Sequence, residues 1–497
     1  MRIAAIAVLV VVTIAVRAPD AVSESLWWDE VRSARAITTP SPVTAVGRIR
    51  SESSPPLWFF LGRLVHGGGE LLERIGAPSG VASVEAVRLI AVLASAVLTV
   101  LVVVYASRFM PFPGALLAGL LAGLAWQSVV HGKELRAYAL LAALVVALPL
   151  ALEATLRNPT RRRLLGFAVL VAAGSMTHYF FLVALGTAAM WVAWTRQPAW
   201  RRVGVAAAVG LLPLIAWLPI LVYQSTRVNR YFPAFTPRRV FNLYSDLFAT
   251  GEVWTTLGTA GRALVIVAVL SGAAVLVRRG AEGQLCAALA VVPVAATAFV
   301  WLLGLRIFDV RNLIIVLPFA AIAIAALAAA IPFRPVAAVA LAGVGVAMVA
   351  AFWVNRDLGR TPLDEVAEAL AGWSWGEGDV IVRFGSVGEQ SPLAWHLPGH
   401  PRLVSGRPSV DRCRTVYAVV DTRTGQRWLE DHAGAVTARA SFPSYTGWVA
   451  GRRKTLELVA ARLSAPPGLV AEAAERGGSP DYVPGAPAPP CVSAAYP

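Results

Sequence analysis

Long apolar stretches recur along most of the chain, and each is close to the length of a helix that crosses a membrane. Such a helix needs about 20 predominantly apolar residues. We expect eleven spans, placed at residues 3–18, 86–107, 112–130, 136–155, 164–178, 181–195, 203–223, 258–277, 283–304, 312–331 and 335–353. The pair within 164–195 is also compatible with one long tilted helix. The pattern predicts a polytopic α-helical membrane protein, because a membrane β-barrel would show short alternating strands instead.

The composition agrees with a membrane protein. The chain has 497 residues, of which 57% are hydrophobic and 15% are charged, whereas a soluble protein averages about 25% charged residues. The formal net charge of +15 would point to nucleic acid in a soluble domain. Here the arginines gather in short loops between apolar stretches, as membrane topology requires. We therefore expect a lipid bilayer as partner and no nucleic acid.

The short basic loops predict the orientation in the membrane. With eleven spans and a cytoplasmic N-terminus, these loops all fall on the cytoplasmic side, where Lys and Arg are favoured; they contain Arg108, 157–163, 196–202, Arg278–Arg279 and Arg334. Ten spans would place Arg278–Arg279 opposite 157–163, so eleven spans fit better. The first span reads as an uncleaved anchor in the cell (cytoplasmic) membrane, because no small-residue cleavage site precedes Asp29.

The chain changes character after the last apolar stretch. We expect a transmembrane module at 1–354, with a first outer loop at 19–85, and a small extracytoplasmic α/β domain at 355–485. In that domain "TPLDEVAEALAGW" and "GQRWLEDH" are typical of helices, and "DVIVRF" (379–384) and "TVYAVVD" (415–421) of buried strands. Residues 486–497 are expected to be disordered.

Three cysteines are present. Cys286 lies in an apolar stretch and is expected to serve packing. Cys413 and Cys491 lie in the C-terminal part of the chain, where an oxidising compartment would permit a disulfide between them without requiring it.

Two adjacent carboxylates, Asp29 and Glu30, directly follow the first apolar stretch in "SLWWDE". Carboxylates near hydrocarbon are costly, so they usually have a partner or a function. One interpretation makes Asp29 a general base and Glu30 the residue that orients a partner or ligand. The alternative is a solvated acidic pair that caps a helix, since acidic side chains favour a helix N-terminus.

A dense group of charges stands at the entrance to the fourth expected span, in "HGKELRAYAL". It contains Lys133, Glu134, Arg136 and Tyr138. Arg as a bidentate fork and Lys as a point charge suit the phosphate of a lipid-linked ligand. The alternative is that the basic side chains extend to the interface and form an internal ion pair.

Further polar residues fall on the expected outer side. His178, in "THYFF" with Tyr179, suits a proton shuttle, a metal ligand or, preferably, a plain hydrogen-bonded residue. Four arginines could hold phosphate or pair with Asp309 or Asp29; they are Arg227, Arg230, Arg306 and Arg311. A phosphate-binding GxxxxGK[ST] loop does not occur, so a nucleotide donor is not supported.

The order of these motifs resembles the GT-C glycosyltransferases, specifically the family 39-like bacterial relatives of protein O-mannosyltransferases and lipid A aminoarabinose transferases. The resemblance covers most of residues 1–355. It rests on five segments in this order: "LWWDEVRSA", "SPPLWFFLGRL", "ELRAYAL", "THYFFL" and "DVRNLIIVLPFA". The last segment departs from the pattern, because Arg311–Asn312 stands where relatives often have Arg–Tyr.

The resemblance implies an enzyme that moves a sugar, with mannose and arabinose both compatible, from a polyprenyl-phosphate donor to an acceptor hydroxyl with inversion. It implies that Asp29 removes the acceptor proton and that Glu30 holds an Arg or a metal. Lys133 and Arg136, with Arg230 or Arg311, would neutralise the lipid phosphate; further substrate-binding residues would be Glu134, Tyr138, His178 and Tyr179. The expected acceptor is a glycan, lipid or protein. Whether the reaction needs a divalent metal is left open.

Two other functions remain compatible with these residues. A transporter or flippase of lipid-linked glycans would also place Arg at the membrane boundary, but would favour broken helices in matching halves. A non-catalytic membrane scaffold would use the C-terminal domain to bind a partner, and would not need the carboxylate of Asp29.

Overall fold

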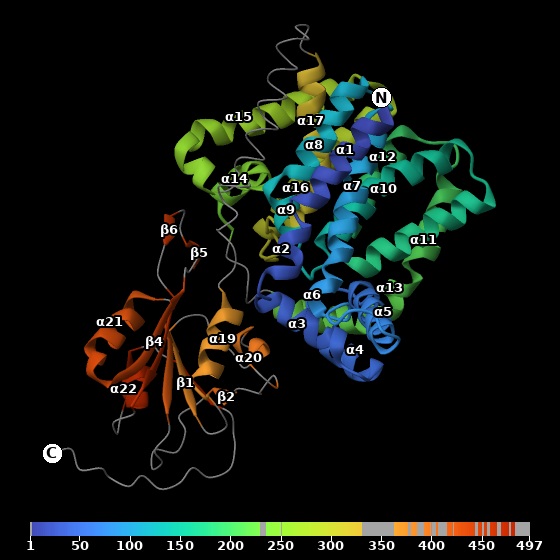
Figure 1. Ribbon diagram of the computed structural model, residues 1–497. Helices are drawn as coiled ribbons and strands as arrows, with labels where there is room; N and C mark the ends of the chain where they lie inside the picture. Colours follow the sequence, from blue (N-terminus) through green and yellow to red (C-terminus); the bar gives the residue numbers. More distant parts are fainter. Residues whose placement is uncertain are drawn as a thin grey trace, which may run out of the picture. The chain divides into compact units, whose positions relative to one another are not determined.

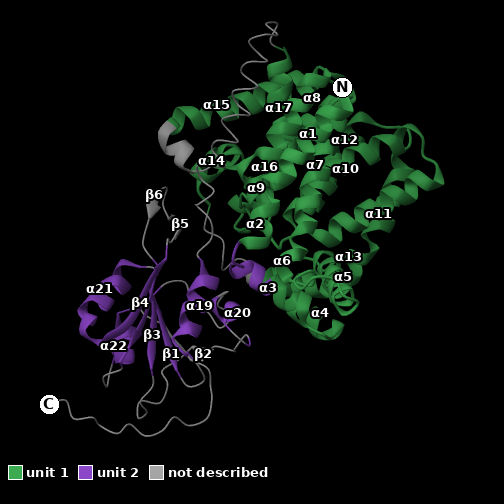
Figure 2. Cartoon of the chain, in the orientation of Figure 1, with its two compact units in different colours: residues 1–23, 33–354 green, residues 24–32, 355–497 purple. Residues whose placement is uncertain are grey.

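The structure is a computed structural model that divides the chain into two compact units. It describes residues 2–228, 235–249, 251–330 and 362–375, and shorter segments between 379 and 482 that hold the elements named below. Unit 1 comprises residues 1–23 and 33–354, and unit 2 comprises residues 24–32 and 355–497 (Figure 2). Each unit is described by itself.

Unit 1 is helical in its described residues. Its helices up to the third apolar stretch are α1 (Arg2–Ala15), α2 (Ala18–Ser23), α4 (Pro42–Arg50), α5 (Leu57–Arg74), α6 (Val84–Val87), α7 (Leu89–Ala106), α8 (Phe112–Leu124) and α9 (Trp126–His131). The later ones are α10 (Tyr138–Arg157), α11 (Arg161–Thr177), α12 (Phe181–Thr195), α13 (Trp200–Val228), α14 (Pro237–Phe248), α15 (Gly251–Val277), α16 (Gly280–Leu302), η1 (Asn312–Val316) and α17 (Leu317–Ala330). Helix α3 (Trp28–Thr38) begins in unit 2 and ends in unit 1.

Seven helical stretches of the described chain are long and apolar enough to cross a membrane. They are Arg2–Ser23, Val84–Ala106, Tyr138–Arg157, Trp200–Thr226, Leu257–Val277, Gly280–Leu302 and Asn312–Ala330. Phe112–Leu124 and Phe181–Thr195 are shorter apolar helices. The expectation of a multi-pass helical membrane protein is therefore confirmed. The count of eleven stays a prediction, and the expected span 335–353 lies outside the described residues.

The expected span at 112–130 is not one continuous helix, because two helices meet at Ala125. Ala125 has an extended backbone (φ −54°, ψ 140°), which ends α8 and starts α9. The guanidinium of Arg17, from the segment after α1, donates to the carbonyl of Gly123. The last carbonyl groups of a helix have no partner within the helix and need hydrogen-bond donors from other parts of the chain or from water. A side chain from another helix therefore satisfies the end of α8.

The segment 164–195 is two helices and not one long tilted helix. Helix α11 ends at Thr177, and His178 has an extended backbone (φ −160°, ψ 138°) before α12 begins at Phe181. The sharp turn brings Gly174 so close to Phe181 that an added Cβ would lie 2.4 Å from the ring. Only a residue without a side chain allows this approach.

The core of unit 1 lies among α7, α8, α10, α16 and α17, which run beside one another in Figure 1. Small residues let these helices approach closely, as is common in membranes. At Gly272 of α15, an added Cβ would lie 1.9 Å from the carbonyl oxygen of Ala323 on α17. Cys286 of α16 is buried and unbridged, as the apolar stretch around it predicts.

Unit 2 contains a six-stranded mixed sheet in the order β2-β8-β1-β3-β7-β4. Its strands are β1 (Val380–Phe384), β2 (Val404–Ser405), β3 (Val416–Val420), β4 (Val436–Phe442), β7 (Leu458–Leu463) and β8 (Ser479–Tyr482), and β5 (Thr446–Val449) and β6 (Arg452–Lys454) form a separate pair. The two strands expected at 379–384 and 415–421 are confirmed as β1 and β3. They pair in parallel at the sheet centre, where burial on both faces favours uninterrupted apolar runs.

Helices cover both faces of this sheet (Figure 1). The expected helices are confirmed as α19 (Leu363–Gly372) and α21 (Arg423–Asp431). Helices α21 and α22 (Leu469–Glu475) pack on the face that bears Val380 and Val382. Helices α19 and α20 (Pro392–His396) pack on the face that bears Ile381. Cys413, Cys491 and the tail 486–497 lie outside the described residues.

Candidate functional site

The acidic pair lies in the first turn of α3. Asp29 is half-buried and Glu30 is fully buried. One carboxylate oxygen of Glu30 lies 3.4 Å from the backbone N–H of Trp27, which donates to it. An acidic side chain that accepts the N-cap N–H is half of a capping box. Glu30 therefore caps the helix, as one interpretation held, but it is not a solvated residue.

The segment that carries Asp29 groups with the C-terminal unit. Within unit 2, the hydroxyl of Ser25 donates to Oδ1 of Asp364, at the start of α19. The backbone N–H of Asp364 in turn lies 3.5 Å from the Ser25 hydroxyl. The chain before Asp29 is thus held by a helix that begins more than 300 residues later.

The basic residues of the turn between α9 and α10 are buried and paired. Lys133 donates from Nζ to Oδ2 of Asp20 at 2.9 Å. Arg136 donates from Nη1 to Oε2 of Glu52 and to the hydroxyl of Ser33, both at 3.1 Å. These ion pairs are made with carboxylates outside the segment 131–140, and the two basic side chains are buried and do not extend to solvent. Buried ion pairs are expensive to desolvate, so they are seldom placed without a second role.

Asp20 and Glu52 were not singled out from the sequence. Asp20 follows the first apolar stretch and Glu52 stands in "SESSPP". The only sequence signal is that Asp20 is an acidic residue close to an expected membrane boundary, where an isolated carboxylate is costly; no such signal marks Glu52.

A third residue missed from the sequence is His131, which pairs with Glu134. Nδ1 of His131 lies 2.7 Å from Oε2 of Glu134, and both side chains are almost completely buried. The imidazole also faces the ring of Tyr138, with centroids 4.6 Å apart. Tyr138 in turn faces His178 at 5.6 Å. The turn therefore places four of the expected binding residues in one buried group: Lys133, Glu134, Arg136 and Tyr138, with His178 beside it.

His178 has a local structural contact. Its Nδ1 accepts the backbone N–H of Phe180 at 3.2 Å. This bond stabilises the turn between α11 and α12. The preferred interpretation of His178 as a hydrogen-bonded residue is confirmed by this contact.

Tyr179 connects two distant parts of unit 1. Its hydroxyl donates to Oε1 of Gln224 at 2.5 Å and accepts the indole N–H of Trp217 at 3.1 Å. Burial raises the pKa of Tyr179 to about 12, so the phenol keeps its proton and remains a donor. Gln224 then donates to the carbonyls of Ile49 and Ser54 at 3.0 and 3.3 Å. Tyr179 thus positions the loop that also carries Glu52.

Of the outer arginines, Arg311 is held by Asp309. Nε of Arg311 and its backbone N–H lie 3.2 and 2.9 Å from the same carboxylate oxygen. This is the local pairing considered from the sequence. Arg230 lies outside the described residues, as does the side chain of Arg227. Among the described residues, no group of three or more His, Cys, Asp or Glu side chains is placed to hold a metal.

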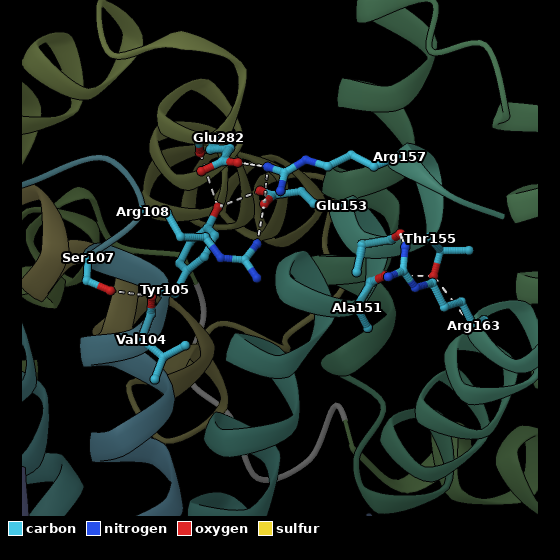
Figure 3. A network of polar contacts seen from close by, with 11 residues as sticks. Val104, Tyr105, Ser107, Arg108, Ala151, Glu153, Thr155, Arg157, Arg163 and Glu282 are labelled. Carbon is cyan, nitrogen blue, oxygen red and sulfur yellow. Dashed lines mark hydrogen bonds and ion pairs between the residues drawn. The ribbon is translucent and has the colours of Figure 1, made fainter. Parts of the chain in front are cut away.

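A second polar network lies at the other end of α10 (Figure 3). Nη1 of Arg108 lies 2.8 Å from Oε2 of Glu153, which is buried. Tyr105 donates to Oε1 of Glu153 at 3.4 Å and to the carbonyl of Glu282 at 3.1 Å. Arg157 pairs with both Glu153 and Glu282. Because Glu153 follows Tyr138 by 15 residues on α10 and a helix rises about 1.5 Å per residue, the centre of this network is about 22 Å from Tyr138 along the helix.

These helices define a multi-pass membrane protein, and the likeness to solved structures gives it the GT-C fold. Among solved structures, the chain is similar to ArnT from Cupriavidus metallidurans bound to undecaprenyl phosphate: the TM-score is 0.55 at 14% identity, over 93% of this chain and 97% of that one. The apo form of the same protein gives a TM-score of 0.51 at 13% identity, over 92% and 97%. No family model and no curated protein matches the chain.

Proposed function

We propose that the protein is a glycosyltransferase that moves a sugar from a polyprenyl-phosphate donor to an acceptor hydroxyl. The observation that carries the proposal is the buried turn with Lys133 and Arg136 within a GT-C fold. Two buried cations side by side suit a phosphate that leaves with a full negative charge. The likeness to a structure that binds undecaprenyl phosphate supports a lipid-linked donor.

The reaction would invert the anomeric carbon. The acceptor oxygen forms a bond to that carbon while the carbon–oxygen bond to phosphate breaks, and the electron pair leaves with the phosphate. Asp29 takes the proton of the acceptor hydroxyl, and Lys133 and Arg136 stabilise the departing phosphate. Glu30 fixes the first turn of α3 through the Trp27 N–H, which orients Asp29. A role for Glu30 in holding an Arg or a divalent metal remains a prediction.

The carboxylates beside the two cations have a function in this scheme. Asp20 and Glu52 compensate Lys133 and Arg136 before the donor arrives, because an unpaired buried charge is strongly destabilising. A phosphate could then share these cations without a large rearrangement. Arg230 and Arg311 remain further candidates for phosphate contact, and Tyr138, His178 and Tyr179 for contact with other parts of the substrates.

The site would face the outside of the cytoplasmic membrane. This follows from eleven spans, a cytoplasmic N-terminus and an extracytoplasmic C-terminal domain, which the positions of the short basic loops support. The sugar would be a hexose or a pentose, with mannose and arabinose as first choices, and the acceptor a glycan, lipid or protein of the envelope.

The test is a transfer assay with purified full-length protein in lipid. A panel of radiolabelled polyprenyl-phosphate sugars is offered with the cell envelope fraction as acceptor, with and without a chelator. Asp29→Asn is compared with the wild type, and Asp431→Asn, at an exposed carboxylate of unit 2, is the matched control. We expect transfer by the wild type and the control, and loss of at least about 100-fold in Asp29→Asn, the lower range for a removed general base.

Each other outcome favours a different function. Transfer that survives in Asp29→Asn removes Asp29 as the base and keeps the enzyme class. Movement of labelled lipid between leaflets without transfer would favour a transporter or flippase. Neither transfer nor movement, with a partner still bound, would favour a scaffold.

A further inference from the structure

The buried pair of His131 and Glu134 has a ring nitrogen that the proposed reaction has not used. Nδ1 of His131 contacts the carboxylate of Glu134 at 2.7 Å. The other nitrogen, Nε2, is buried and has no hydrogen-bond partner within the described part of the chain. A buried polar atom without a partner costs about 1–3 kcal/mol. Such an atom beside charged residues is a candidate contact for a ligand.

A second buried atom next to this pair points to the kind of ligand. Arg17 donates to the carbonyls of Thr13 and Gly123 and to the hydroxyl of Ser128, but its Nε has no partner among the described residues. An added Cβ at Gly132, the neighbour of His131, would lie 2.3 Å from this Nε. Because Nε of Arg is a donor only, it requires an acceptor. A phosphate oxygen is one acceptor that meets this requirement.

Charged and aromatic residues of the same turn accompany His131. From the same turn, Lys133 and Arg136 are paired with Asp20 of α2 and Glu52 of the loop before α5. Tyr138 of α10 faces the imidazole, with His178 beyond it. A neutral imidazole can give its one N–H to Glu134, whereas a protonated one donates from both nitrogens. The second donor then needs an acceptor with negative charge.

We propose that His131, positioned by Glu134, is a phosphate-contacting residue whose Nε2–H donates to a phosphate oxygen. The inference rests on the proposed function, because the phosphate belongs to the lipid-linked donor or product. The positive end of α10 lies at the same turn and favours the same anion. No covalent bond forms at His131; it supplies a charge-assisted hydrogen bond.

The test measures the dissociation constant of undecaprenyl phosphate for full-length protein in nanodiscs at pH 5.5, 6.5 and 7.5. The phosphate itself titrates near pH 6, and this affects every variant equally. His131→Gln is therefore compared with the wild type at each pH. The matched control is His432→Gln, because His432 also pairs with a glutamate, Glu472, at 3.2 Å in unit 2.

We expect the wild type to lose affinity relative to His131→Gln as the pH rises. One linked proton changes the ratio of the two dissociation constants by about tenfold per pH unit at most, within the range where imidazole titrates. His432→Gln should follow the wild type. Glu134→Gln should reduce the pH dependence. If inorganic phosphate competes with undecaprenyl phosphate, the phosphate group alone is recognised. If inorganic phosphate does not compete, the lipid-linked form is required.

A ratio that stays constant with pH would overturn the role of His131 and leave the proposed function intact. If the wild type binds neither undecaprenyl phosphate nor inorganic phosphate, both the proposed polyprenyl-phosphate donor and the role of His131 are refuted. Folding is checked by size-exclusion chromatography and thermal unfolding. If His131→Gln does not fold, His131→Asn replaces it; its amide is too short to take the place of Nε2, so we expect the same trend with pH relative to the wild type as for His131→Gln.

Discussion

Arg136 and Glu52 form a buried ion pair, with Nη1 and Oε2 3.1 Å apart, although 84 residues separate them in the chain. Both side chains are almost inaccessible. The pair connects the turn before α10 with the loop before α5. In the proposed reaction, the same guanidinium also contacts the departing phosphate, so the pair links the stability of the fold to donor binding.

Glu52→Gln should destabilise the protein and make it more dependent on the donor phosphate. Removal of one partner of a buried ion pair typically costs about 3–5 kcal/mol, because the remaining charge is left uncompensated. Undecaprenyl phosphate can replace the lost charge, so it should raise the Tm of Glu52→Gln by more than that of the wild type. Thermal unfolding in detergent with and without the lipid measures both effects. Glu70→Gln, at a half-exposed position on α5, is the control, and an equal ligand-induced shift in all three proteins would contradict the prediction.

Gly132→Ala should disturb the packing around Arg17. The added Cβ would lie 2.3 Å from Nε of Arg17 and 2.5 Å from the hydroxyl of Ser95. Inserting a group into a filled interior typically costs about 1–3 kcal/mol. Gly166→Ala on α11 is the matched control, since no atom lies within 4 Å of its added Cβ. The prediction fails if the two variants unfold at the same temperature.

Glu153→Gln should lower stability without changing the candidate site. Its carboxylate accepts from Arg108 at 2.8 Å in the network of Figure 3. Loss of a hydrogen bond to a charged group costs about 2 kcal/mol. Since Glu153 is about 22 Å from Tyr138 along α10, the dissociation constant of undecaprenyl phosphate should stay within about twofold of the wild-type value, a change of less than one RT. A large loss of binding would show that the two ends of α10 are coupled.

Glu73 should make the loop after α5 sensitive to acid. Its Oε1 accepts the N–H groups of Gly80 and Ala82 at 2.7 and 3.0 Å. The bond from Ala82, followed by that from Gly80, holds the pKa of Glu73 below its ordinary value. A carboxyl with a lowered pKa in the folded state stabilises the fold above its unfolded pKa of about 4.3, and this contribution is lost as the pH falls through the lowered value.

Hydrogen exchange of the Gly80 and Ala82 amides measures this effect, after correction for the intrinsic rate at each pH. Protection in the wild type should be constant from about pH 7 to 5 and fall below it. In Glu73→Gln, the two amides should show at every pH the low protection that the wild type shows only in acid. Glu70→Gln should behave as the wild type. Equal protection in Glu73→Gln and the wild type at neutral pH would refute the role of Glu73.

Much of the architecture follows from local sequence. The apolar runs are long enough to require membrane helices, because an unsatisfied backbone has no water to bind in lipid. The runs "VIVR" and "VYAVV" are rich in β-branched residues and became β1 and β3. The order of the charged motifs was sufficient to indicate the GT-C fold. These features depend on periodicity and composition within about 20 residues.

The partners of the buried charges were decided by the tertiary structure alone. Lys133 and Asp20 are 113 residues apart, and no local pattern tells which carboxylate meets which cation. The helix break at Ala125 was also decided by the tertiary structure, because neither Gly nor Pro marks it in the sequence. The guanidinium of Arg17, from another segment, donates to the carbonyl at that end of α8. The sequence by itself determined that the chain is a multi-pass helical membrane protein, since hydrophobicity is a property of each segment. Packing decided which polar groups meet, since a buried charge is stable only where a distant segment supplies its partner.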